Sequence, residues 1–104
     1  KARNYHLVRS MAFEAEIDGL KCICSNMPQG RSSFFDTLDG IKDYDVMINF
    51  YMNKKRRWNL SFYSAKKEVD VSKIAARFGG GGHKGAAGAS SLTELPDFIV
   101  KAVQ

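Results

Sequence analysis

Residues 79–89 carry the residue types best suited to chemistry, because four glycines are followed at once by a histidine and a lysine. The segment is Gly-Gly-Gly-Gly-His-Lys-Gly-Ala-Ala-Gly-Ala. Backbone without side chains lets the N–H groups of residues 80–82 converge on an anion, and His83 and Lys84 add a ring donor and a positive charge. The pattern predicts a phosphate-binding loop. The alternatives are a flexible linker and, for His83, a capping or core histidine.

A second group of polar side chains lies along two predicted strands, where amide, hydroxyl and phenol groups alternate with apolar residues. Its members are Asn49, Tyr51, Asn53, Asn59, Ser61 and Tyr63. Such a row suits the stacking of a base and hydrogen bonds to its edges. The alternative is an ordinary solvated sheet face.

Four consecutive cations occupy the turn between these two strands: Lys54, Lys55, Arg56 and Arg57. The whole chain has a net charge of +5 and a pI of about 9.4, which favours polyanionic partners. A cationic turn can attract a nucleic-acid strand over long range. The alternative is a solvated hairpin tip whose charge keeps the sheet edge soluble.

Signals for a complete hydrolytic centre are missing. The chain has two histidines, His6 and His83, and its nearest carboxylate pair, Asp43 and Asp45, has no third ligand beside it in the sequence, so we interpret it as turn chemistry. No nucleophile-elbow or Walker motif occurs. We therefore expect no catalytic residue and no metal site in this chain.

The elements that must position these residues follow from periodicity and turn signals. An Asp-Gly pair splits two alternating runs and predicts a hairpin. We expect strands over residues 11–17, 20–25, 45–53, 58–64 and 89–92, and helices that begin at Ser32 or Ser33, at Ser72 (through residue 78) and at Pro96. The predicted fold is a single α/β (α+β) domain with a mixed, mostly antiparallel sheet of about five strands and about three helices.

Composition and cysteine spacing bound the class of protein. The 104 residues are 44% apolar, which fits one globular domain. No apolar run approaches the roughly 20 residues of a membrane span. Cys22 and Cys24, two apart on a predicted strand, share a face, and we interpret them as buried thiols of a reducing cytoplasm rather than a disulfide or metal pair.

The stretch from Val69 to Gly88 resembles the signature of the DHH-associated domain. It is Val-Asp-Val-Ser-Lys-Ile-Ala-Ala-Arg-Phe-Gly-Gly-Gly-Gly-His-Lys-Gly-Ala-Ala-Gly, and a strand ending Ser-Phe-Tyr-Ser at residue 64 precedes it. This domain is the C-terminal, substrate-binding part of DHH-family phosphoesterases, which include RecJ-like exonucleases and small oligoribonucleases. The resemblance extends over about residues 45–89 and implies that residues 1–104, which begin with Lys1, are cut from a longer enzyme.

The resemblance implies a cytoplasmic, metal-dependent phosphodiesterase that hydrolyses short oligonucleotides or dinucleotides to mononucleotides. Manganese or magnesium would be bound by a separate catalytic DHH domain, so the isolated chain is expected to be inactive and to hold no cofactor. The expected partners are that catalytic domain and a short oligonucleotide, dinucleotide or nucleoside monophosphate. No membrane is expected, and a homodimer is possible.

The same resemblance implies which residues hold the phosphate, sugar and base of the terminal nucleotide. They are Gly79, Gly80, Gly81, Gly82, His83, Lys84, Ser61, Tyr63 and Ser64. Many relatives carry arginine where this chain has Tyr63, whose phenol can hydrogen-bond or stack instead. Two rival hypotheses stay open. One is a nucleic-acid docking module similar to the C-terminal piece of alanyl-tRNA synthetase, and the other is a dimerisation domain whose glycines only pack tightly.

Overall fold

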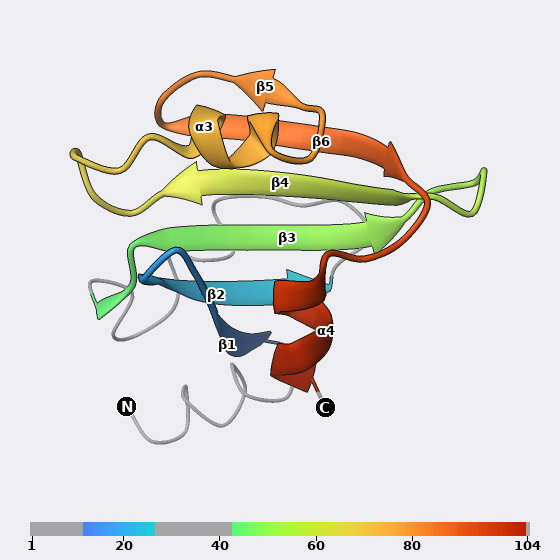
Figure 1. The fold of residues 1–104 in the computed structure, drawn as a ribbon, viewed down its shortest axis with the longest axis horizontal. Helices are drawn as coiled ribbons and strands as arrows, with labels where there is room; N and C mark the ends of the chain where they lie inside the picture. Colours follow the sequence, from blue (N-terminus) through green and yellow to red (C-terminus); the bar gives the residue numbers. More distant parts are fainter. Residues whose placement is uncertain (1–11, 27–42, 104) are drawn as a thin grey trace.

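A mixed six-stranded sheet forms the centre of the computed structural model, which describes residues 12–26 and 43–103 (Figure 1). The strands are β1 (Ala12–Ile17), β2 (Leu20–Asn26), β3 (Val46–Met52), β4 (Trp58–Ser64), β5 (Gly81–Gly82) and β6 (Ala86–Leu92). Their order across the sheet is β1-β2-β3-β4-β6-β5. β2 and β3 run parallel, and every other neighbouring pair is antiparallel. The predicted α+β class is confirmed, and β5 is the strand that side-chain periodicity did not indicate.

Two short helices, α3 (Val71–Ala76) and α4 (Asp97–Val103), lie on the same face of the sheet (Figure 1). Asp70 caps α3, since its carboxylate accepts the Ser72 N–H at 3.0 Å. The helix therefore begins one residue before the predicted start and ends two residues before the predicted end. The helix predicted to begin at Ser32 or Ser33 lies outside the described residues. Neither described helix is long and apolar enough to cross a membrane.

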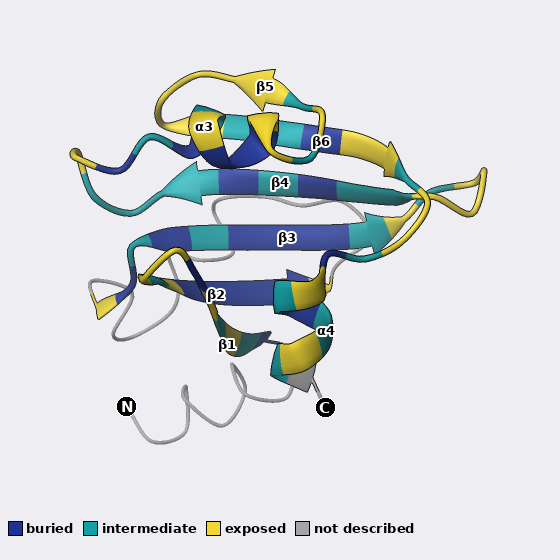
Figure 2. Ribbon diagram, in the orientation of Figure 1, coloured by how far each residue is buried: buried dark blue, intermediate teal, exposed yellow. Residues whose placement is uncertain are grey.

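The main core lies between the sheet and these helices. Alternate residues of β2, β3 and β4 point into it, as the strand period requires. Phe62 is fully buried at its centre and stacks on Phe78, with ring centroids 6.2 Å apart. The apolar alternation predicted along both strands is confirmed for Val46, Ile48, Phe50, Leu60 and Phe62, which belong to one cluster. Of the other two residues predicted on this face, Trp58 packs against the cluster, and Met52, at the end of β3, is 49% exposed. Figure 2 shows the buried band running through β2, β3 and β4.

The opposite face of the sheet has a polar centre. Ser25 and Asn49 are buried partners across the parallel β2–β3 pair, and the Ser25 hydroxyl donates to Asn49 Oδ1 at 2.7 Å. Asn49 therefore belongs to the interior, whereas Tyr51, Ser61 and Tyr63 on the same face are partly exposed. Within the predicted row of polar side chains, Asn49 is thus closed to a ligand, and the partly exposed residues are the ones that a ligand can reach.

Cys22 and Cys24 are buried free thiols, as predicted, and burial raises the pKa of both above the usual value. For Cys22 the pKa reaches about 12, mainly through desolvation and then through the charge of Asp45. Unfolded thiols ionise near pH 9, so the unfolded chain holds fewer protons than the folded one above that pH. We therefore expect the free energy of unfolding to fall as pH rises from 9 towards 12.

Reactivity with a thiol reagent tests this burial directly. Both cysteines are expected to resist Ellman's reagent in the folded protein at about pH 8 and to react at once in denaturant, because the thiolate is the reacting form. Rapid reaction of either thiol under native conditions would contradict the burial.

Candidate functional site

The two sequence segments with the strongest chemical signals lie at opposite ends of the sheet (Figure 1). Residues 79–85, here called the glycine loop, precede β6 and turn beside the end of β4. Residues 54–57, here called the basic tip, join β3 to β4 at the other end. Both segments are largely exposed (Figure 2).

The first two glycines of the glycine loop end the helix α3. Gly79 has a φ of 82°, a left-handed conformation that side chains rarely adopt. Its N–H donates to Ala76 O at 3.1 Å, and the Gly80 N–H donates to Ala75 O at 2.8 Å. These two bonds form a Schellman motif. The amide of Gly80, expected to serve the anion, is thus engaged in the helix cap.

The next two glycines form β5, the edge strand that pairs with β6. A Cβ atom at Gly80 would lie 2.0 Å from Gly88 O, and one at Gly82 would lie 2.6 Å from Ala87 Cα. A Cβ at Gly81 would meet nothing within 4 Å. Glycine at 80 and 82 is therefore required by the close approach of two backbones, while Gly81 is free of this constraint.

The glycine loop then closes in a tight turn that the rest of the domain holds in place. His83 and Ala86 exchange two backbone hydrogen bonds, of 2.8 and 3.3 Å. The carbonyl of Lys84 accepts the Val71 N–H at 2.9 Å, and that of Gly85 accepts the Ser64 N–H at 3.0 Å. The segment is therefore a fixed hairpin and not a flexible linker.

The outer side of this hairpin offers donors. Because His83 and Ala86 form a hydrogen-bonded pair, the antiparallel alternation turns the N–H of Gly82 towards the open edge. The side chains of His83 and Lys84 are exposed at the turn. An anion at this edge can meet one backbone N–H, an imidazole and an ammonium group.

A cavity of about 320 Å³ lies beside the turn, between it and the chain that leaves β4. We call it the lysine pocket. Its lining residues are Ser64, Ala65, Lys66, Lys67, Val69, Lys84 and Gly85. Three of these seven residues are lysines, and none is acidic. Two carboxylates outside the lining offset part of this charge, because Asp45 pairs with Lys66 and Asp70 interacts electrostatically with Lys84.

Asp45 holds one of the lysines in position. Its Oδ1 lies 2.8 Å from Lys66 Nζ, and its Oδ2 accepts the Lys21 N–H at 2.8 Å. The hydrogen bond from Lys66 is the main reason that the pKa of the Asp45 carboxyl is lowered. Within residues 12–26 and 43–103, Lys67 and Lys84 make no ion pair, so both charges remain available to a ligand.

The structure brings some of the predicted site residues together and separates others. Ser64 lines the lysine pocket next to the turn that carries His83 and Lys84. Ser61 and Tyr63 lie on the sheet face away from the helices, and Tyr63 packs against the small cluster that contains Ile23 and Tyr44. They are therefore near the same end of β4 but on another surface.

Lys66 and Lys67 line the pocket, although the sequence indicated them only as cations around the glycine motif and not as substrate-binding residues. Both lie in the loop after β4, which the pairing of β4 with β6 and the hydrogen bonds of the turn to Ser64 and Val71 bring beside Lys84. The sequence signal that could have found them is their position two and three residues after the Ser-Phe-Tyr-Ser strand end.

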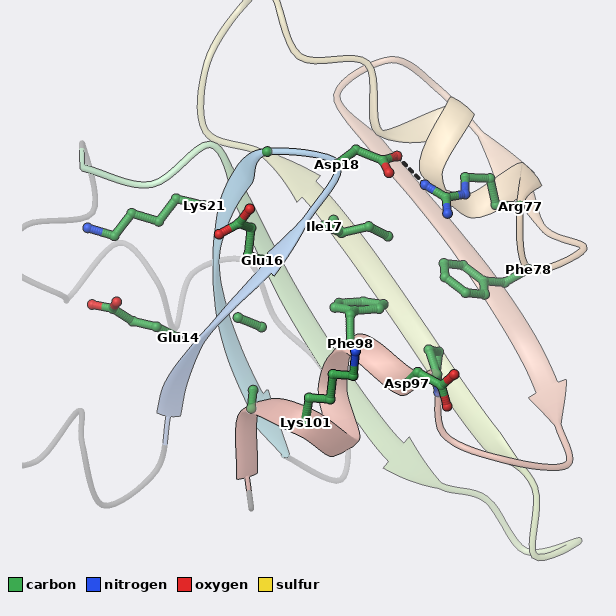
Figure 3. A pocket seen from close by; sticks show the side chains of 14 residues that line it. Glu14, Glu16, Ile17, Asp18, Lys21, Arg77, Phe78, Asp97, Phe98 and Lys101 are labelled. Atoms are coloured by element: carbon green, nitrogen blue, oxygen red, sulfur yellow. Dashed lines mark hydrogen bonds and ion pairs between the residues drawn. The ribbon is translucent and has the colours of Figure 1, made fainter.

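A larger cavity, of about 910 Å³, lies elsewhere, between the β1–β2 turn, the end of α3 and the start of α4 (Figure 3). Its walls include Ile17, Phe78 and Phe98, and Arg77 at its rim forms an ion pair with Asp18. Acidic and basic side chains both line it, whereas the lining of the lysine pocket has no acidic residue.

The potential metal ligands of the described chain are scattered. In residues 12–26 and 43–103, no three His, Cys, Asp or Glu side chains gather closely enough to hold a metal ion. His6 lies outside these residues.

Comparison with known proteins places this α+β domain in a family. The model of the DHHA1 domain matches residues 24–104, so the chain belongs to the DHHA1 domain family. The resemblance inferred from the glycine signature is confirmed. A search of curated proteins finds no match.

Three solved structures share the fold at low sequence identity. An uncharacterised protein from Helicobacter pylori G27 matches with a TM-score of 0.63 and 19% identity over 96% of this chain and 27% of its own. A pGpG-specific phosphodiesterase from Vibrio cholerae matches with a TM-score of 0.61 and 11% sequence identity, over 98% of this chain and 36% of its own. An exopolyphosphatase-related protein from Bacteroides fragilis matches with a TM-score of 0.58 and 18% sequence identity, over 96% of this chain and 32% of its own. The chain thus spans about a third or less of the length of these proteins.

Proposed function

We propose that this domain holds the phosphate end of a short oligonucleotide or dinucleotide for a DHH-family phosphoesterase. Membership of the DHHA1 family supports the class of enzyme. The observation that carries the proposal is the lysine pocket beside the glycine loop. There the ammonium groups of Lys67 and Lys84, which form no ion pair in the described part of the chain, lie with an imidazole and an outward backbone N–H at one end of the domain. Charge-assisted hydrogen bonds of this kind are the strong ones in phosphate recognition.

The chemistry of cleavage is assigned to a separate catalytic domain with manganese or magnesium, which would activate water and stabilise the leaving oxygen. In this proposal His83 donates to the phosphate, Lys84 and Lys67 supply charge, and Tyr63 contacts the base or sugar. The fold shared with a pGpG-specific phosphodiesterase fits a substrate of dinucleotide size. The whole enzyme is proposed to be cytoplasmic.

Ligand titration of the 104-residue chain tests the proposal. With adenosine monophosphate and the dinucleotide pApA, we expect backbone amide shifts in residues 79–85 and 63–67. His83→Ala should abolish them, and Lys84→Gln should weaken affinity about tenfold through the loss of a charged hydrogen bond. Lys73→Gln, an exposed charge on α3, is the matched control and should bind as the wild type does.

Two results would contradict the proposal. Shifts confined to residues 54–57, or no shifts at all, would leave the glycine loop a purely architectural element. Steady hydrolysis of pApA by the pure chain with manganese would show that catalysis does not need a separate domain.

A further inference from the structure

The basic tip is the main source of the excess positive charge of the protein. Removing these four of the sixteen lysines and arginines would lower the net charge from +5 to +1. All four residues are exposed, and none of them pairs with an acidic side chain in the described part of the chain. The function proposed above does not use this charge.

The backbone of the tip is held in a defined turn. Asn53 Oδ1 accepts the N–H groups of Lys55 and Arg57 at 2.9 and 3.1 Å. The Asn53 N–H donates to Arg57 O at 2.8 Å, and Arg56 has a left-handed φ of 60°. These constraints hold the four cationic residues close together on an ordered backbone, so the backbone of the turn loses less conformational entropy when a ligand binds.

A partly exposed polar track runs along β4, on the sheet face away from the helices, from the tip towards the strand end that lies beside the glycine loop. Asn59, Ser61 and Tyr63 alternate along β4 on one face, with Asn59 at the tip end and Tyr63 at the loop end. Their neighbours on β6 are small, since Gly88 faces Ser61 and Ala86 faces Tyr63. The track therefore has amide, hydroxyl and phenol groups on β4 and small side chains on the neighbouring β6.

We propose that the basic tip is a second contact for single-stranded nucleic acid, which binds the backbone of a strand whose end lies at the glycine loop. Proteins that bind single strands combine a cationic path for the backbone with aromatic groups for the bases. The seven residues of β4 extend about 20 Å at about 3.4 Å per residue. At about 3.4 Å per stacked nucleotide, about six nucleotides span this distance. The placing of the strand's end rests on the function proposed above.

Length dependence tests the inference with oligoadenylates of 2, 4, 8 and 12 nucleotides (chosen to lie on both sides of the estimated span, about six). The wild-type chain should gain affinity between the tetramer and the octamer. Lys54→Gln/Lys55→Gln should lose that gain, bind the dodecamer about tenfold more weakly at low salt, and show a salt slope smaller by about 1.4. Its affinity for the dinucleotide should be unchanged.

The matched control is Lys73→Gln/Lys101→Gln, which removes two exposed charges from α3 and α4 on the other face. It should keep the gain with length. Equal losses in both double variants would show that only net charge matters, and an unchanged dodecamer affinity in the tip variant would also overturn the inference.

Two further outcomes distinguish nucleic-acid binding by the tip from the function proposed above and from binding to a lipid surface. Failure of the dinucleotide to bind, with dodecamer binding still dependent on the tip, would refute the proposed function and support the tip as a nucleic-acid contact. Met52 beside the tip is 49% exposed. An exposed apolar side chain next to four cations could also bind an anionic lipid surface, so vesicles of phosphatidylserine are the competing probe. Tip-dependent vesicle binding without any dodecamer binding would overturn the inference in favour of a lipid surface.

Discussion

Replacement of Gly80 by alanine is expected to destabilise the domain by about 3 kcal/mol, since overpacking costs most where nothing can move aside. The added methyl would lie 2.0 Å from Gly88 O and 2.7 Å from Ala89 Cα. Both are backbone atoms of β6, which is itself paired to β4. The Gly80 N–H also closes the end of α3. Relief of the clash would therefore separate the edge of the sheet or open the helix cap.

Urea denaturation of Gly80→Ala and Gly81→Ala measures this effect with a neighbouring control. A methyl group added at Gly81 would have no atom within 4 Å, and Gly81 has an ordinary φ. Its replacement should change stability by no more than about 0.5 kcal/mol, with a small gain from the stiffer unfolded chain. Equal stabilities of the two variants would show that the backbone at Gly80, just before β5, does not lie as close to β6 as the structure places it.

Replacement of Phe62 by alanine is expected to cost about 4 kcal/mol, the range seen when a buried aromatic ring is removed from a core. Phe62 is fully buried on β4, and its ring stacks on Phe78 of the segment after α3. The deleted ring therefore leaves a cavity between the sheet and the helices. The free energy of unfolding of a domain is about 5–15 kcal/mol in total, so this variant would lose much of its stability.

Thermal unfolding of Phe62→Ala should show a midpoint lower by about 15 °C or more, at roughly 4–8 °C per kcal/mol for a domain of about this size. Met52→Ala is the control, because Met52 is 49% exposed at the end of the adjacent strand. It should cost less than about 1 kcal/mol. A similar loss in both variants would place the centre of the core elsewhere.

Much of the fold could be predicted from local patterns. The apolar alternation of β3 and β4 and the Asp-Gly turn between β1 and β2 placed four strands to within one residue at the ends that the structure describes. The buried thiols of Cys22 and Cys24 followed from the same period of two. These features depend on neighbours in the sequence, and periodicity detects such neighbours directly.

The rest depends on distant contacts. Glycines have no side chains to alternate, so no pattern could reveal that residues 81 and 82 form a strand, or that β6 begins at Ala86 rather than Ala89. The lysine pocket is equally non-local, because Lys66 and Lys84 meet through the pairing of β4 with β6 and through the turn that binds Ser64 and Val71. The separation of the basic tip from the glycine loop likewise required the strand order.

The parallel pairing of β2 with β3 has a consequence for the folding route. It divides the described sheet into the β1–β2 hairpin and the antiparallel group of β3, β4, β6 and β5. Hairpins form within about 1–10 μs because their contacts are local. Ser25 and Asn49, by contrast, are 24 residues apart in the chain, and non-local pairings must first meet the entropy of closing the loop. The union of the two parts at this buried polar seam is therefore a slow step of folding, together with the pairing of β4 with β6, which joins Leu60 to Ala89 across a similarly long stretch of chain.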